Sequence, residues 1–359
     1  MQGGRRGFLA GVAALGLAPR LGWAAAGAPT YLAAAGLPDG SFVLLGLGDD
    51  GDERFRLPLP ARGHAAAAHP TRPEAVAFAR RPGSYAIVLD CLEGDVLTRL
   101  AAPEGRAFQG HGAFSADGAT LFTTEVAEDG RGVIGLWDAG AGYGRIGEVS
   151  SGGDGPHEML LMPGGARLAV ANGGILTDLA SGRTPLNLAE MRPNLASLDP
   201  ATGAVQQMLE LPAALRFNSL RHLAAGSDGT LAAALQWAGA QIETPPLLAL
   251  HRPGADALEF RSAPEALQRR MRNYAGSVAV SGDGRRAALT SPKGGLMLAF
   301  DLDGDGVEAL EAADICGVAT AASGGFACTT GEGRFLAGGG PARLHSGLAF
   351  DNHLVRIAG

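Results

Sequence analysis

The sequence predicts an all-β protein, a seven-bladed β-propeller whose N- and C-terminal strands close the ring. The main observation is a histidine that returns with spacings of 47, 46 and 65 residues, at His64, His111, His157 and His222. In three of these copies a glycine follows seven residues later, at Gly118, Gly164 and Gly229. A period in the forties, with a short strand and a glycine turn in each unit, is typical of propeller blades. We therefore expect the histidines at equivalent places around one axis.

Composition favours a single repeat domain. The 359 residues include 56 glycines and 21 prolines, and 46% are hydrophobic. These values suit many short strands separated by turns and argue against disorder. The formal net charge is −7, and removal of residues 1–26 takes away three arginines and no acid, which makes it −10. With this acidity and a single lysine, Lys293, the chain is not expected to bind nucleic acid.

Residues 1–26 have the features of an export signal. Arg5 and Arg6 precede a small, apolar run, residues 10–18, and Ala24-Ala25-Ala26 forms an A-x-A cleavage pattern. The order of charged, apolar and small residues predicts a signal peptide, and the paired arginines indicate the twin-arginine type. A general secretory signal is the alternative. No other stretch is long enough to span a membrane. We therefore expect the mature protein to be periplasmic. We also expect it to be a monomer.

The domain, residues 27–359, begins with a hairpin at 30–36 and 41–45 and a third strand at 54–59. Each later unit has an inner strand, a second strand after a glycine turn, an aliphatic third strand that often ends in Asp, and a polar fourth strand. The units begin near His64, His111, His157, His222, Ser277 and Val318. Residues 348–355 have no unit of their own, and we expect them to supply the inner strand of the first blade. This pairing closes the ring and removes its edges.

Two stretches interrupt the period. Residues 177–193 lengthen the fourth unit and predict a loop or a short helix on one rim. Residues 264–272 have helical composition and precede the fifth inner strand. Insertions of this kind lie on one face of a propeller and often shape a binding surface.

The repeated histidines are the candidate metal ligands. Inner strands line the central channel, so His64, His111, His157 and His222 are expected to point to a shared axis, and His353 of the closing strand makes a fifth. Converging imidazoles are good ligands for iron, copper or zinc. Glu158 and Tyr274 are candidate cofactor-binding residues beside them. The alternative is that each histidine only bonds a neighbouring blade.

Other chemical signals are weak. Residues 301–306 imitate the start of a calcium loop, but the twelfth position is Ala312 rather than glutamate, so calcium is not expected. No C-x-x-C-H motif is present, which excludes covalent c-type haem. Cys316 and Cys328 flank one turn and are either a disulfide or two buried thiols, whereas Cys91 is a core residue. No catalytic residue is assigned, because no nucleophile–base motif occurs.

Several motifs together resemble an uncharacterised family of exported bacterial proteins, domain of unknown function 1513. They are the paired arginines and the segments 110–115, 155–158, 187–193, 219–222, 273–277 and 350–354. Phe350 is the one departure, since tryptophan is expected before Asp-Asn-His. The resemblance covers essentially the whole mature chain and implies a seven-bladed periplasmic propeller. Its members tend to be encoded beside imelysin-like, iron-regulated proteins, which implies a part in iron acquisition. It assigns no activity and no ligand residues.

The leading functional hypothesis is a non-catalytic periplasmic protein of iron or copper handling. The histidines would hold the metal, or a ligand that bears it, at the channel mouth, and the rim insertions would meet an imelysin-like or redox partner. The second hypothesis is an interaction scaffold with structural histidines. The third is a metal-assisted enzyme in which Glu158 or Tyr274 supplies an acid or base.

Overall fold

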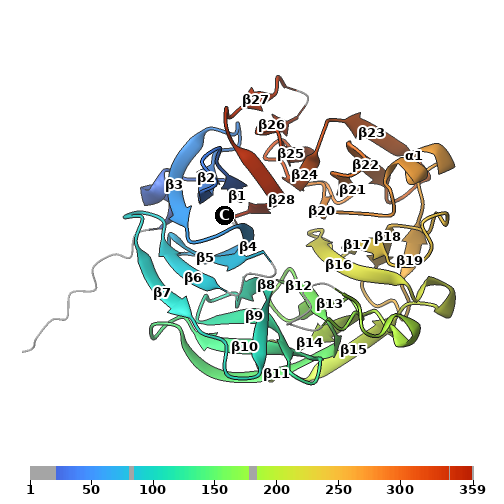
Figure 1. The fold of residues 1–359 in the computed structure, drawn as a ribbon, viewed down its shortest axis with the longest axis horizontal. Coiled ribbons are helices and arrows are strands. Elements are labelled where there is room, and N and C mark those ends of the chain that lie inside the picture. The colour runs from blue at the N-terminus through green and yellow to red at the C-terminus, as the bar shows by residue number, and fades with distance from the viewer. Residues whose placement is uncertain (1–21, 81–84, 178–183, 339, 358–359) are drawn as a thin grey trace, which may run out of the picture.

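The protein is a seven-bladed β-propeller (Figure 1). The structure, a computed structural model, describes residues 22–80, 85–177, 184–338 and 340–357. Each blade is a sheet of four antiparallel strands, and the seven sheets surround one central channel. The predicted fold class and the number of blades are confirmed. The predicted signal peptide lies outside the described residues except for its last five positions, where the short 3-10 helix η1 (Trp23–Ala26) forms.

The first blade joins the two ends of the chain. Its strand order is β28-β1-β2-β3, with β28 (Ala349–Arg356), β1 (Tyr31–Gly36), β2 (Phe42–Leu47) and β3 (Glu53–Leu59). The register pairs Leu32 with Val355 and Ala33 with Leu354. The C-terminal strand is therefore innermost, as predicted, and both edges of β1 are paired.

The other six blades each follow the chain from the channel outward. The second blade contains β4 (Gly63–Ala68), β5 (Glu74–Ala79), β6 (Ala86–Asp90) and β7 (Val96–Leu100), and the third contains β8 (Arg106–Phe114), β9 (Thr120–Ala127), β10 (Arg131–Asp138) and β11 (Gly144–Asp154). The fourth blade contains β12 (Pro156–Leu161), β13 (Leu168–Asn172), β14 (Asn194–Leu198) and β15 (Val205–Glu210), and the fifth contains β16 (Asn218–Ala225), β17 (Leu231–Trp237), β18 (Leu248–His251) and β19 (Glu259–Arg261). The sixth blade contains β20 (Ser277–Val280), β21 (Arg286–Ser291), β22 (Leu296–Asp301) and β23 (Val307–Glu311), and the seventh contains β24 (Ile315–Thr320), β25 (Phe326–Thr330), β26 (Arg334–Ala337) and β27 (Arg343–Leu344).

The hydrophobic core is divided among the blade interfaces. Seven buried clusters occur in the described chain, and each takes residues from two neighbouring sheets. Between the last blade and the first, for example, Tyr31 packs with Phe335 and Leu354. Because both faces of the inner sheets are covered, strands such as β13 are buried along their whole length.

The two predicted insertions lie between blades or strands. Residues 264–272 contain the helix α1 (Glu265–Arg270), as their composition predicts. In the other insertion the 3-10 helix η2 (Leu188–Glu190) forms, and Thr177 pairs with Pro185, while residues 178–183 lie outside the described part. A further 3-10 helix, η3 (Ala213–Leu215), precedes β16. No helix in the described ranges is long and apolar enough to cross a membrane.

Candidate metal centre

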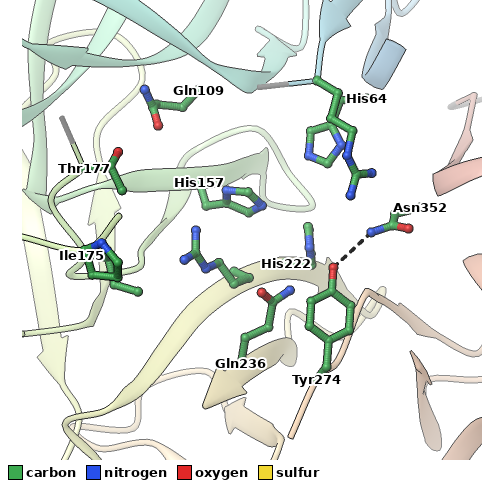
Figure 2. Close-up of a pocket in the computed structure, with 12 residues that line it drawn as sticks. His64, Gln109, His157, Ile175, Thr177, His222, Gln236, Tyr274 and Asn352 are labelled. Carbon is green, nitrogen blue, oxygen red and sulfur yellow. Dashed lines mark hydrogen bonds between the residues drawn. The ribbon is translucent and has the colours of Figure 1, made fainter. Parts of the chain in front are cut away.

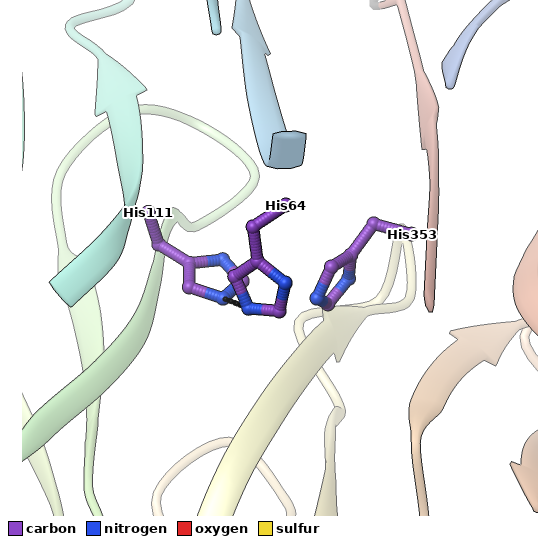
Figure 3. Close-up of side chains that lie close together, drawn as sticks. All are labelled: His64, His111 and His353. Atoms are coloured by element: carbon purple, nitrogen blue, oxygen red, sulfur yellow. Dashed lines mark hydrogen bonds between the residues drawn. The ribbon is translucent and has the colours of Figure 1, made fainter. Parts of the chain in front are cut away.

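The five predicted histidines lie together in the channel. They come from five consecutive blades, through β28, β4, β8, β12 and β16. In eight pairs of these histidines the ring centroids are 4.5 to 5.9 Å apart. Figure 3 shows His64, His111 and His353 pointing toward one another from three different strands. The prediction that the period places these side chains around one axis is confirmed geometrically.

An irregularity in each inner strand directs its histidine to the axis. The ladder shifts register between Gly63 and Ala66 in β4, and between Phe108 and Gly112 in β8. Corresponding shifts occur in β12, in β16 and in the pairing of β28 with β1. A bulge leaves extra residues unpaired and turns side chains that would otherwise pack between sheets. Strand β20, which carries Ser277 instead of histidine, has a continuous register. Strand β24 also lacks a histidine but shifts between Ile315 and Val318, so the bulge is not confined to the histidine strands.

Gly110 allows His111 to pack closely against His64. It immediately precedes His111 and has φ +96°, a conformation that side chains with a Cβ rarely adopt. A Cβ at this position would lie 2.9 Å from Cδ2 of His64. Gly110 is therefore required for the packing of His111 against His64.

The donor atoms are close enough to share an ion. Three groups have ligand atoms that all lie within 4.8 Å of one another: His64, His111 and His353; His111, His157 and His222; and Glu158, His222 and His353. Nε2 of His111 and Nε2 of His64 are 3.2 Å apart. Glu158 Oε2 is 3.0 Å from Nδ1 of His222 and accepts a hydrogen bond from the Leu223 amide. Imidazoles with one carboxylate form a donor set suited to iron, copper or zinc.

Burial favours the neutral form of four of the imidazoles. His64, His111, His222 and His353 are 2 to 9% exposed. Burial lowers the pKa of His64, and burial together with neighbouring positive charges holds the pKa values of His157, His222 and His353 well below the ordinary range. A neutral imidazole offers a nitrogen lone pair to a metal. Among the described residues, Nδ1 of His64 and Nε2 of His353 are buried without a hydrogen-bond partner.

The carboxyl group of Glu158 responds to the same burial. Burial raises its pKa to about 8, which leaves it mostly protonated at neutral pH when no cation is near. A bound cation would favour its ionised form instead, because the charge of the ion lowers the pKa of a coordinating acid. The donor set therefore fits a metal ion in three respects: neutral imidazoles, two unpaired buried nitrogens and one carboxylate.

Asp351 supports one side of the cluster. It is 5% exposed, and its Oδ1 lies 3.8 Å from Nδ1 of His64. Its carboxylate also receives Arg62 at 2.6 Å and Arg80 at 2.5 Å. Burial by itself would raise the pKa of Asp351, but the pairing with His64 and the charge of Arg80 outweigh it and keep the group ionised. Asp351 is thus already neutralised by two arginines, and it lies near His64 without a hydrogen bond to its Nδ1.

A cavity of about 250 Å³ opens beside the cluster. Figure 2 shows His64, His157 and His222 on its wall, together with Tyr274 and Asn352. The Asn352 amide donates to the Tyr274 hydroxyl over 3.2 Å, and Lys293 Nζ lies 4.3 Å from the centre of the Tyr274 ring. The predicted cofactor-binding residues therefore lie at different places, with Glu158 among the histidines and Tyr274 on the cavity wall.

Several residues of the site were not predicted from the sequence. Asp351, Arg62 and Gln109 each stand two residues before a histidine of the cluster, so the same repeat alignment contains a signal for them. Arg80 carries no such signal, because it follows β5 and reaches Asp351 across 271 residues of chain.

The cysteines and the aspartates of residues 301–306 have structural contacts in the described chain. All three cysteines are free and buried, so Cys316 and Cys328 are the two buried thiols of the second alternative. Asp301 accepts a bond from the Asp303 amide in the turn between β22 and β23, and Asp305 is fully exposed. These are ordinary roles of aspartate in a turn.

Comparison with known proteins supports the fold and identifies the family. The chain is similar to a solved structure titled "Kuenenia stuttgartiensis Hydrazine Synthase", with a TM-score of 0.61 and 13% sequence identity, over 81% of this chain and 86% of the other. At this identity the likeness shows the fold alone. No curated protein matches the sequence. Residues 57–357 match the family described as "Protein of unknown function (DUF1513)". The chain therefore belongs to the DUF1513 family.

Proposed function

We propose that this protein is a periplasmic accessory protein of iron or copper handling that binds a metal ion in the histidine cluster. The observation that carries the proposal is the convergence of five histidines and Glu158, with ligand atoms within 4.8 Å in three overlapping groups. Two buried imidazole nitrogens without a hydrogen-bond partner add support, since such atoms are costly unless something binds them.

The central location of the cluster also favours metal binding over purely structural roles. A histidine with a purely structural role needs one backbone partner, as His251 shows with its bond to Ala255 in the same blade. The cluster instead brings neutral rings from five blades against one another, which concentrates lone pairs that an ion would satisfy. The enzyme hypothesis would in addition need an acid or base beside the ion. Glu158 is a candidate for that role, because it belongs to one of the three ligand groups.

Elemental analysis tests this proposal. Untagged protein exported to the periplasm is compared with the double variant His111→Gln/His157→Gln and with the control His251→Gln. The control removes a buried histidine, 7% exposed, outside the cluster. We expect near-stoichiometric iron or copper in the wild type and the control, and its loss from the double variant. Equal metal content in all three, or none in any, would contradict the proposal.

The proposal places the protein in the periplasm because of residues 1–26. Arg5 and Arg6 precede the apolar run, so the change of both to lysine should retain the precursor in the cytoplasm. Fractionation and immunoblotting measure this. Continued export of the variant would favour the general secretory route instead.

A scaffold function is the second candidate, because Nδ1 of His222 and Nε2 of His64 already have polar neighbours at 3.0 and 3.2 Å. In that case the rim insertion, residues 177–193, meets an imelysin-like or redox partner. Its replacement by a short glycine–serine linker, in a variant shown to be folded, should abolish capture of that partner. Retained capture would count against the scaffold.

A further inference from the structure

The cavity beside the histidine cluster has a lining that suits an anion. Besides three of the histidines it is lined by Arg80 and Arg221, and no carboxylate occurs among its described lining residues. The side chains of Gln109, Gln236, Tyr274 and Asn352 add amide and hydroxyl groups. Arginine and amide N–H groups bind carboxylates and oxyanions, and arginine can do so through two parallel bonds.

A metal ion in the cluster would make an anion there more favourable. An imidazole binds a metal ion in its neutral form, so the histidine ligands add no charge to balance the ion. Of the two nearby carboxylates, Asp351 is already paired with Arg62 and Arg80, so only Glu158 is left to balance the ion. A divalent or trivalent cation would then keep an excess of positive charge in a buried place. Such an excess is costly unless a further anion pairs with it.

The size of the cavity restricts the ligand. Its volume of about 250 Å³ lies below the roughly 300–1,000 Å³ of pockets that take drug-sized molecules. This volume suits an anion of a few atoms better than a haem or a large chelate. His64, His157 and His222 face the cavity, and each belongs to at least one of the three ligand groups. An anion inside the cavity can therefore reach an ion held by one of these groups.

We propose that the cavity takes a small oxygen-rich anion, a carboxylate or an inorganic oxyanion, that binds the metal ion of the cluster and Arg221 together. This inference rests on the proposed metal-binding function. It assigns Arg221 a role that follows from its place: it immediately precedes His222 on β16 and lines the same cavity. The ion and the anion are then bound as a pair, each increasing the affinity for the other.

Calorimetry on copper-loaded and metal-free protein tests the pair. The probes are copper(II), oxalate and inorganic phosphate, and the copper content of each sample is measured after the titration. The variant is Arg221→Gln, and the matched control is Arg131→Gln, whose side chain is 68% exposed on β10. We expect at least one anion to bind copper-loaded wild type about tenfold more tightly than metal-free protein, and Arg221→Gln to lose about tenfold with its copper retained.

The outcomes separate this inference from the proposed function. Binding of oxalate alone identifies a carboxylate, and binding of phosphate alone an inorganic oxyanion. Copper retained without anion binding, or equal anion affinity with and without copper, overturns the metal–anion pair and leaves the metal site standing. Equal losses in Arg221→Gln and Arg131→Gln overturn the role of Arg221. Wild type that holds no copper or iron overturns the proposed function, and the pair with it.

Discussion

The change Gly110→Ala should disturb the histidine cluster without removing any of its ligands. Gly110 has φ +96°, and an added Cβ would lie 2.9 Å from His64 Cδ2 and 3.4 Å from the Ala79 carbonyl oxygen. A residue with a Cβ in a left-handed conformation costs about 1–2 kcal/mol. Overpacking in a well-packed interior costs typically about 1–3 kcal/mol more. We expect the free energy of unfolding to fall by about 2–5 kcal/mol.

Gly142→Ala is the matched control. Gly142 has φ +79° in a turn before β11, and nothing lies within 4 Å of an added Cβ. Its expected cost is the conformational part alone, about 1–2 kcal/mol. The entropy that alanine removes from the unfolded chain is common to both variants, so the difference between them reports the contact with His64.

Two measurements decide this prediction. Urea unfolding gives the free energy for both variants, and competition with a chromogenic chelator gives their copper affinity. We expect Gly110→Ala to bind copper about tenfold more weakly, because a displaced His64 ring no longer aims at the shared ion, and Gly142→Ala to bind as wild type does. Equal stability and equal copper affinity in the two variants would refute the reasoning.

Two further predictions concern the framework around the site. Glu125 is fully buried and binds Arg145 through two bonds of 2.8 and 3.0 Å, so Glu125→Ala should lower the free energy of unfolding by about 3–5 kcal/mol. Glu53→Ala, which removes a half-exposed pair with Arg56, should cost no more than about 1 kcal/mol, and similar costs for the two would contradict this. Burial raises the pKa of Cys316 to about 12, so the folded protein should not react with a chromogenic thiol reagent at pH 8, and the unfolded, unreduced protein should release three thiols. A single reactive thiol after unfolding would reveal a disulfide.

Much of the fold could be predicted because it repeats. The spacing of the histidines, the glycine turns and the aliphatic third strands are local patterns, and each blade forms largely from consecutive residues. The closing strand was predictable for a related reason: residues 348–355 were left without a unit, and a ring with an open edge is unfavourable. The ends of the strands predicted for the first blade differ by at most two residues, as for the strand expected at 41–45, which the structure places at Phe42–Leu47.

The candidate site was predictable only in part. The period alone placed His64, His111, His157 and His222 at equivalent positions, and the closing strand added His353. It could not tell which way each ring points, since a shift of one residue turns a side chain to the other face of a strand. The bulges that turn the rings to the axis depend on packing against the neighbouring blades.

The sequence by itself therefore determined the number of blades, the closure of the ring and the five histidines, because these follow from a repeat and from local turn chemistry. Only the tertiary structure decided that the five rings meet, that Asp351 is neutralised by Arg62 and Arg80 from 289 and 271 residues away, and that a cavity lined by arginine opens beside them. The physical reason is that charge pairing and cavity shape depend on distances between blades, and no local pattern in the chain encodes such distances.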